Sequence, residues 1–397
     1  MPVHLAVALD GTGWHPAAWR EPDARPQELF TAGYWRDLIT EAERGRLDFV
    51  TIEDALTPQS SQYSGLDDRT DQVRGRLDAV LIASRVAPLT RNIGLVPTAT
   101  VLHTEPFHIS KAIATLDYVS TGRAGVRIQI GGQAHETSHF GRRQVPEFDR
   151  PDMRDPEYRA FAKQRFAEAG DYVEVVRRLW DSWEDDAEIR DAATGRFVDR
   201  DKLHYIDFSG EFFSVKGPSI TPRPPQGQPP VTALAHARIP YTFAARSTDV
   251  VYVTPHDLGQ ATEILGKVRE EQQSAGRAGE PLHVFGDLVV FLDNGSGQAA
   301  TRKARLDNVS GAEYTSDARI FTGTAAELAD ELLALHEAGL TGFRLRPGVL
   351  PHDLDQITRE LVPELRRRNA FRAEYEANTL RGLLGLSRPA NRYAVSA

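Results

Sequence analysis

The chain has 397 residues, 41% of them hydrophobic, which is enough for one large α/β domain or two smaller ones. It contains no cysteine, so disulfides, zinc–thiolate sites, iron–sulfur clusters and cysteine nucleophiles are excluded. The formal net charge is −9, with acidic and basic residues interspersed and no long basic stripe, which argues against a nucleic-acid partner.

The N-terminal segment, MPVHLAVALDGTGWHP, predicts a strand rather than a targeting signal. Its apolar run lasts only a few residues and follows no basic leader. It is too short for the apolar core of a signal peptide and far too short to span a membrane. We therefore expect a cytoplasmic protein that has no membrane association.

Short apolar runs alternate along the chain with longer segments of helical period. Eight runs are predicted strands: Val3–Leu9, Asp48–Ile52, Ile93–Val96, Gly125–Ile130, Val231–Leu234, Asp249–Val253, His283–Phe291 and Gly342–Leu345. The predicted helices are Phe30–Arg46, Leu77–Val86, one opened by Pro106, Arg165–Trp183, and segments at about 257–275, 324–338 and 353–369. Alternation of apolar strands with helices indicates a parallel sheet covered on both faces. Eight such units predict an α/β protein of the (β/α)8 TIM-barrel class.

Two segments interrupt this alternation, and we interpret them as insertions in a single barrel domain that spans residues 1–397. The first, at about 133–159, is polar and follows the fourth strand. The second, at about 184–230, precedes the fifth strand and contains an acidic run and the sequence PRPPQGQPP. Because βα loops emerge at the carboxyl end of barrel strands, we expect the first insertion at the catalytic mouth. Residues from about 370 to 397 form a C-terminal tail.

Polar side chains follow most of the predicted strands, at the end of the barrel where active sites of this fold lie. In chain order they are His15, Asp54, Thr98, Thr100, His103, Arg127, Gln129, His236, Arg238, Thr254 and His256. Taken singly, each also has a structural interpretation, such as a helix cap for Asp54. Together they predict a mouth rich in His, Thr and Arg, which suits a polar or anionic organic ligand better than a bare metal ion.

The segment His135–His139 matches H-E-x-x-H, the zincin signature. That chemistry needs both histidines on one face of a helix, with the glutamate beside a zinc-bound water. Here the motif comes directly after a strand and two glycines and is followed by Phe140-Gly141, which leaves room for one or two helical turns. We therefore predict no metal site and interpret both histidines as loop residues that face solvent or substrate.

Other familiar motifs are missing from the sequence. No G-x-G-x-x-G follows the first strand, and neither a G-x-S-x-G elbow nor a Walker loop occurs. The sequence therefore gives no support for a Rossmann dinucleotide site or for a serine-hydrolase triad.

Several segments together resemble the luciferase-like flavin monooxygenases, in the branch that includes nitrilotriacetate and dibenzothiophene-sulfone monooxygenases. They occur in order over nearly the whole chain, as WHPAAWR at 14–20, LITEAERGRLDFVTIEDAL at 38–56, IGLVPTATVLHTEPFHISKAIATLDYVSTGRAG at 93–125, SHFG at 138–141, YVEVVRRLWDSWEDDA at 172–187, FFSVKGPSITPRPPQGQPP at 212–230, GTAAELADELLALHEAGLTGFRL at 323–345 and LRGLLGLSRPANRY at 380–393. The resemblance implies a (β/α)8 barrel that uses reduced FMN, supplied by a separate flavin reductase, and molecular oxygen to oxidise a small organic substrate. It also implies a homo-oligomer.

The resemblance implies flavin contacts for Asp54, Thr98 and Thr100, and a place in the cofactor shell for Arg127. The histidines that would line the substrate side are His15, His103 and His135.

Some positions differ from the family pattern. Val126-Arg127 stands where the family has Trp-Asn, and Ala162 and Phe166 replace a His and a Tyr. The Gly-Ser-Ser run of the phosphate loop is replaced by Ala235–Pro240. Either His236 and Arg238 bind the phosphate by direct charge, or the phosphate site is lost.

Three hypotheses for function follow. The first is an FMN-dependent monooxygenase. The second keeps the barrel but uses a deazaflavin or no flavin, with histidines as acid–base groups and Arg127 and Arg238 binding an anionic substrate. The third is a degenerate barrel used for binding or assembly.

Overall fold

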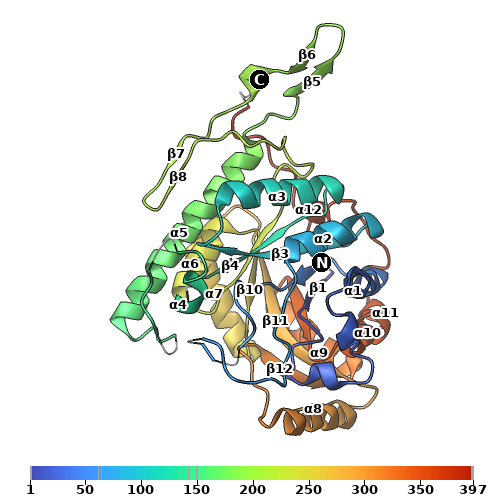
Figure 1. Cartoon of the computed structure of the whole chain (residues 1–397). Helices are drawn as coiled ribbons and strands as arrows, with labels where there is room; N and C mark the ends of the chain where they lie inside the picture. Colours follow the sequence, from blue (N-terminus) through green and yellow to red (C-terminus); the bar gives the residue numbers. More distant parts are fainter. Residues whose placement is uncertain are drawn as a thin grey trace.

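The computed structural model describes residues 2–60, 62–63, 65–131, 133–141, 144–148 and 151–394. Eight parallel strands close into a barrel surrounded by helices (Figure 1). In barrel order they are β1 (His4–Leu9), β2 (Phe49–Ile52), β3 (Gly94–Val101), β4 (Val126–Ile130), β9 (Val231–Leu234), β10 (Val250–Val253), β11 (His283–Leu292) and β13 (Gly342–Pro347), and β13 pairs back with β1. The predicted (β/α)8 fold and all eight predicted strands are confirmed.

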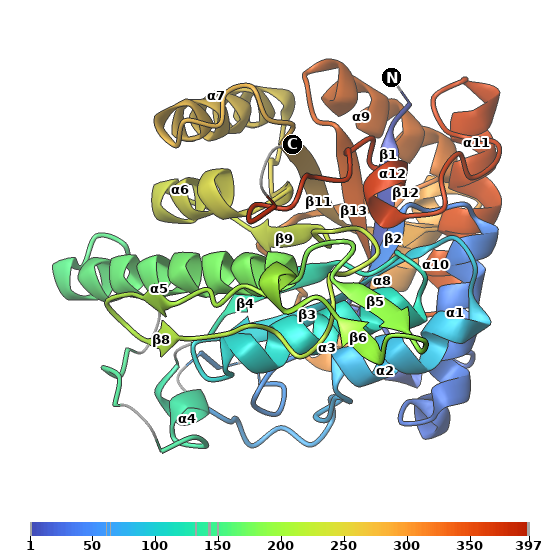
Figure 2. The same ribbon diagram turned by 90° about the horizontal axis from the view of Figure 1, so that it is seen from above.

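The helices that cover the barrel are α1 (Ala32–Arg44), α2 (Ala79–Val86), α3 (Pro106–Val119), α5 (Pro156–Asp181), α6 (Arg238–Ser247), α7 (Leu258–Ser274), α8 (Ser296–Ser310), α9 (Ala325–Glu337), α10 (His352–Gln356) and α11 (Val362–Arg367). Figure 2 shows α5, α6 and α7 packed side by side on one flank. Side-chain caps mark the start of many of them, and at α9 Thr324 and Glu327 form a reciprocal capping box. No helix in the described part of the chain is long and apolar enough to cross a membrane.

Elements that were not predicted from the sequence include α6, α8 and the edge strand β12 (Arg319–Gly323), which pairs with β11. Pro240 lies in the first turn of α6, where its missing N–H has no intrahelical partner to lose. Helix α5 begins at Pro156, capped by Asp155, and not at Arg165, so the end of the first predicted insertion is helical.

The C-terminal tail closes the amino-terminal end of the barrel. Leu380 of α12 (Leu380–Leu383) and the following Leu384 pack against interior residues such as Phe49 and Phe285. A Cβ at Gly94 would lie 2.6 Å from Leu380 Cδ1, so only glycine at that position lets the tail approach β3. This end of the barrel is therefore filled by apolar side chains.

The second predicted insertion contains two short hairpins, β5 (Glu188–Asp191) with β6 (Arg196–Val198), and β7 (Phe208–Ser209) with β8 (Ser214–Val215). They project from the end of α5, beside the C-terminal segment of the chain (Figure 1). Arg223 and Arg392 both bind the carboxylate of Asp181, at 3.0 and 3.2 Å, and join these segments to α5.

Candidate functional site

Charged side chains from several strands meet inside the barrel and form a chain of ion pairs. Asp287 on β11 accepts hydrogen bonds from Arg344 on β13, with Nε–Oδ1 at 2.8 Å and Nη2–Oδ2 at 2.5 Å. It also accepts from Arg346, at 3.0 and 2.5 Å, and Arg346 continues to Asp317, with Nη1–Oδ1 at 2.7 Å. Burial acts to raise the pKa of the Asp287 carboxyl, but Arg344 and Arg346 outweigh burial and hold that pKa below its usual range. The interior carboxylate is therefore ionised.

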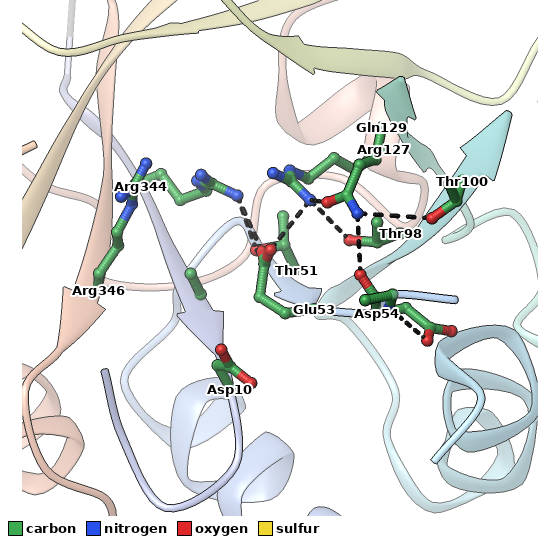
Figure 3. Close-up of polar contacts among 12 residues, drawn as sticks. Asp10, Thr51, Glu53, Asp54, Thr98, Thr100, Arg127, Gln129, Arg344 and Arg346 are labelled. Atoms are coloured by element: carbon green, nitrogen blue, oxygen red, sulfur yellow. Dashed lines mark hydrogen bonds and ion pairs between the residues drawn. The ribbon is translucent and has the colours of Figure 1, made fainter. Parts of the chain in front are cut away.

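The chain of ion pairs continues to β2 and β4 through Glu53 (Figure 3). Glu53 Oε1 lies 3.2 Å from Arg344 Nη1, and Glu53 Oε2 lies 2.9 Å from Arg127 Nη1. The same Arg127 Nη1 donates to Thr98 Oγ1 and to Gln129 Oε1, both at 3.1 Å. Arg127 Nε is buried and has no hydrogen-bond partner among the described residues. Arg127 and Glu53 are 6% and 7% exposed, so the pair lies below the surface of the mouth.

Asp54 connects the end of β2 to the start of α2. Its carboxylate accepts hydrogen bonds from the backbone N–H of Ala55, at 2.7 Å, and of Ala79, at 2.9 Å. Burial raises the pKa of Asp54 against the effect of these bonds. Gln129 Nε2 donates to the Asp54 carbonyl oxygen at 3.1 Å and lies 3.5 Å from Thr100 Oγ1.

The structure thus brings together five predicted residues from the ends of β2, β3 and β4, namely Asp54, Thr98, Thr100, Arg127 and Gln129 (Figure 3). We call this group the strand-end cluster; it consists of Glu53, Asp54, Thr98, Thr100, Arg127 and Gln129. Glu53 was not predicted, although it follows β2 directly and the strand-end rule applies to it equally.

A separate cleft of about 560 Å³ lies beside β1. We call it the β1-side cleft; its lining includes Asp10, Trp14, His15, Gln59, Arg69, Arg76, His135 and Tyr314. Asp10 and Arg76 form a bidentate ion pair at its edge, at 2.7 and 3.1 Å. Asp10 directly follows β1, so its place in the site could have been predicted from its position at a strand end. Arg76 lies in an irregular segment, and the sequence contains no pattern that marks it as a site residue.

Of the predicted substrate-side histidines, His15 and His135 both line the β1-side cleft. His15 Nδ1 accepts from the backbone N–H of Ala17 at 3.0 Å, so Nε2 carries the proton and donates to Asp307 on α8, also at 3.0 Å. Burial lowers the pKa of His15 in spite of Asp307, and both ring nitrogens are engaged within the protein. His135 differs, because its Nδ1 is buried without a partner among the described residues.

The H-E-x-x-H segment does not form one helix. Helix α4 spans Ala134–Thr137, so His139 lies beyond its end and is exposed. Across the described residues, no three His, Cys, Asp or Glu side chains gather in a way that could hold a metal ion.

His103 lies away from the β1-side cleft, in a second cavity of about 600 Å³ between the end of β3 and the first turns of α5. It follows Leu102, whose φ of 82° is in the left-handed region. Its ring stacks on Phe140 with centroids 5.0 Å apart, and Nε2 is 3.6 Å from Glu136 Oε2. Glu136, inside the dismissed motif, was not predicted as a partner.

His236 and Arg238 diverge from one another. His236 Nδ1 lies 3.1 Å from Thr254 Oγ1, and its Nε2 lies 3.5 Å from Asp317. Arg238 turns to α7, where its Nε donates to Glu271 at 3.0 Å while its side chain is 88% exposed. The two side chains therefore do not form one phosphate cradle in this arrangement.

The described residues do not fit a flavin ring placed on the strand-end cluster, the position that the resemblance implies. The Asp54 carboxylate accepts from backbone N–H groups, and the Thr98 hydroxyl accepts from Arg127. The Gln129 amide is engaged with Arg127 and with the Asp54 carbonyl oxygen. Thr98 and Thr100 are 2% and 5% exposed, which leaves little surface for a ligand. On the phosphate side, Phe166 packs against Phe243, with centroids 5.8 Å apart, and supplies no polar hydrogen. Most polar groups of this cluster are thus engaged within the protein, with Arg127 Nε as the exception, and the predicted cofactor roles stay predictions.

Comparison with known proteins gives the family. The sequence model of the family described as luciferase-like monooxygenase matches residues 12–342. The N-acetyl-S-(2-succino)cysteine monooxygenase of Bacillus subtilis (strain 168) is 30% identical, over 99% of this chain and 98% of that protein. The nitrilotriacetate monooxygenase component A of Aminobacter aminovorans is 29% identical, with the same coverage. The crystal structure of a long-chain alkane monooxygenase shares the fold at a TM-score of 0.84 and 22% identity, over 97% of this chain and 96% of that one. The chain belongs to the luciferase-like monooxygenase family of oxidoreductases, as its sequence segments predicted.

Proposed function

We propose that this protein is a flavin-dependent monooxygenase that uses reduced FMN and molecular oxygen to oxidise a small polar organic substrate. The match to the family over residues 12–342, together with nearly full-length relatives that are named monooxygenases, carries this proposal. In flavin enzymes the cofactor performs the redox chemistry, and the protein supplies binding, orientation and electrostatics. The lack of a nucleophile motif in the sequence agrees with that division.

The β1-side cleft is the proposed substrate site. Its lining is polar, with Gln59, His135 and Tyr314 among its residues, and this composition favours a hydrogen-bonding substrate over a long hydrocarbon. His135 is the best placed of the predicted histidines, because it lines this cleft and its buried Nδ1 has no partner among the described residues.

We further propose one barrel domain over residues 1–397, a homo-oligomer in the cytoplasm, and a separate flavin reductase as partner. The name of the nitrilotriacetate relative, component A, supports a system of more than one component.

A second candidate is a barrel with altered cofactor use, either a deazaflavin enzyme or a flavin-independent enzyme; a degenerate, non-catalytic binding barrel is the remaining alternative. The strand-end cluster favours it, because the Asp54 carboxylate is already bound to backbone N–H groups, and Thr98 and Glu53 already bind Arg127.

The two candidates differ in flavin binding and in product. Purified protein is titrated anaerobically with photoreduced FMN. It is then supplied with a flavin reductase, ¹⁸O₂ and either N-acetyl-S-(2-succino)cysteine or nitrilotriacetate as probe. The first candidate requires saturable binding of reduced FMN and one ¹⁸O atom in the product. If no binding occurs at high micromolar flavin, the second candidate takes its place.

A further inference from the structure

Glu53 and Arg127 bridge the ends of two strands that are not neighbours. Strand β3 lies between β2 and β4, and the register places Thr98 of β3 directly beside Arg127. Pro97, the residue before Thr98, pairs with Ile52, the residue before Glu53. Glu53, Thr98 and Arg127 therefore lie in one layer, joined by contacts of 2.9 and 3.1 Å (Figure 3). The layer crosses the carboxyl end of the barrel from β2 to β4.

This layer is anchored on the far side of the barrel. Glu53 shares its carboxylate with Arg344, which is itself fixed by the bidentate contact to Asp287. The Arg344 guanidinium also lies over the ring of Tyr252, 4.2 Å from its centroid. Breaking a buried ion pair by removing one partner is costly when the other charge is left alone. Here Glu53 has two cations, so it is held in place even when one of them moves.

The layer is closed to solvent at the ends of β2, β3 and β4. Its three side chains are between 2% and 7% exposed, and their polar groups are directed at one another and not at the mouth. The unpartnered atom, Arg127 Nε, indicates that Arg127 is the less firmly held end of the pair. A ligand seated on the strand-end cluster requires Arg127 to move first.

We propose that the Glu53–Arg127 pair is a specificity determinant that closes the strand-end cluster to a flavin ring. This inference rests on the proposed function, because the pair then sets the flavin affinity of the enzyme. When only a fraction of molecules has the binding-competent arrangement, the apparent dissociation constant rises by the inverse of that fraction. Wild-type protein is thus expected to bind FMN weakly, and a variant in which the pair is absent is expected to bind it tightly.

The test compares FMN affinity between variants at position 127. Arg127→Asn shortens the side chain and removes its charge, while Glu53 keeps Arg344 as a partner, so no carboxylate is left alone. Arg127→Lys keeps the charge and the reach to Glu53. Arg177→Asn is the control for general loosening, because it breaks the 2.7 Å pair with Asp249, which likewise keeps a second arginine, Arg381. Oxidised FMN is measured by fluorescence quenching and reduced FMN by anaerobic calorimetry.

We expect Arg127→Asn to bind both forms of FMN at least tenfold more tightly than wild type. Arg127→Lys and Arg177→Asn are expected to stay within about threefold of wild type, since a factor of three is less than 1 kcal/mol. If Arg127→Asn unfolds below the assay temperature, the double variant Glu53→Ala/Arg127→Asn, which removes both charges, decides the question by the same tenfold criterion.

The inference is overturned if the folded Asn variant binds FMN no more tightly than wild type. Weaker binding would identify Arg127 as a flavin ligand, and the proposed function would stand. A third outcome is that Arg127→Asn binds FMN tightly but the wild type forms no ¹⁸O-labelled product. That outcome would support the role of the Glu53–Arg127 pair in excluding flavin and would count against the proposed monooxygenase function. If neither protein binds FMN, both proposals fail.

Discussion

Asp287 and Arg344 stand directly opposite each other on β11 and β13, and both side chains are fully buried inside the barrel. Two parallel hydrogen bonds join them, and the same carboxylate also holds Arg346. One buried carboxylate thus binds two buried guanidinium groups, whose other anionic partners are Glu53 and Asp317.

We expect Asp287→Ala to lower the free energy of unfolding by at least about 3–5 kcal/mol, because it leaves two buried guanidinium groups without their shared partner. Urea denaturation followed by circular dichroism measures this. The control is Asp330→Ala, which breaks the exposed pair with Arg368 and should cost at most about 1 kcal/mol. If both variants lose a similar amount of stability, the ion pairs inside the barrel contribute no more to stability than a surface ion pair.

Asp117 should make stability depend on pH. It lies fully buried in α3 and accepts hydrogen bonds from the backbone N–H of Ala124 and from both the N–H and the side-chain amide of Gln226. Burial outweighs these bonds and raises the pKa of Asp117 to about 6 from its usual 3.8. A raised pKa in the folded state means that the stabilising contribution is complete below the unfolded value and is lost as the pH rises through about 6.

The free energy of unfolding of the wild type should therefore fall by about 2–3 kcal/mol between pH 4 and pH 6.5 on account of this group. Asp117→Asn cannot titrate and should show a flatter pH profile, even though its amide hydrogens oppose the N–H of Gln226 and lower its stability overall. The measurement is the difference between the two profiles, since histidines titrate in both proteins. Parallel profiles would contradict the prediction.

His135 should matter for turnover, whereas His139 on the same segment should not. Among the described residues, His135 lines the β1-side cleft and has a ring nitrogen without a partner, whereas His139 is exposed. We expect His135→Ala to lower kcat/KM about tenfold or more, the worth of one hydrogen bond to substrate, with the melting temperature unchanged. His139→Ala is the matched control. Equal effects of the two substitutions would remove His135 from the substrate site.

Leu380 should contribute to the stability of the fold and not to ligand binding at the carboxyl end of the barrel. It is fully buried at the amino-terminal end of the barrel, where it packs with residues such as Phe49 and Phe285. Leu380→Ala is expected to lower the free energy of unfolding by about 2–5 kcal/mol in chemical denaturation, because the surrounding side chains cannot move in to fill the cavity. Leu81→Ala, at a position that is 68% exposed, should cost less than about 0.5 kcal/mol. A change in ligand binding with little loss of stability would mean that the tail acts on the mouth.

The barrel itself could be predicted because each strand is buried on both faces and therefore reads as a short apolar run. The elements that were missed have weak signals. Helix α8 buries a narrow stripe that includes Ala299 and Leu306, and α6 has a proline in its first turn. The segments that resemble the family could also be recognised, because each is continuous in the sequence and does not depend on contacts between distant residues.

The sequence alone determined the fold class, the family and the gathering of Asp54, Thr98, Thr100 and Arg127 at one end of the barrel. Only the tertiary structure showed that most of the polar groups of these residues are engaged in hydrogen bonds and ion pairs within the protein. The reason is that their partners come from remote strands: Glu53 and Arg344, for example, are separated by 291 positions and meet only when β13 closes against β1. Charge balance inside a closed barrel depends on every strand at once, and no single segment of the chain contains it.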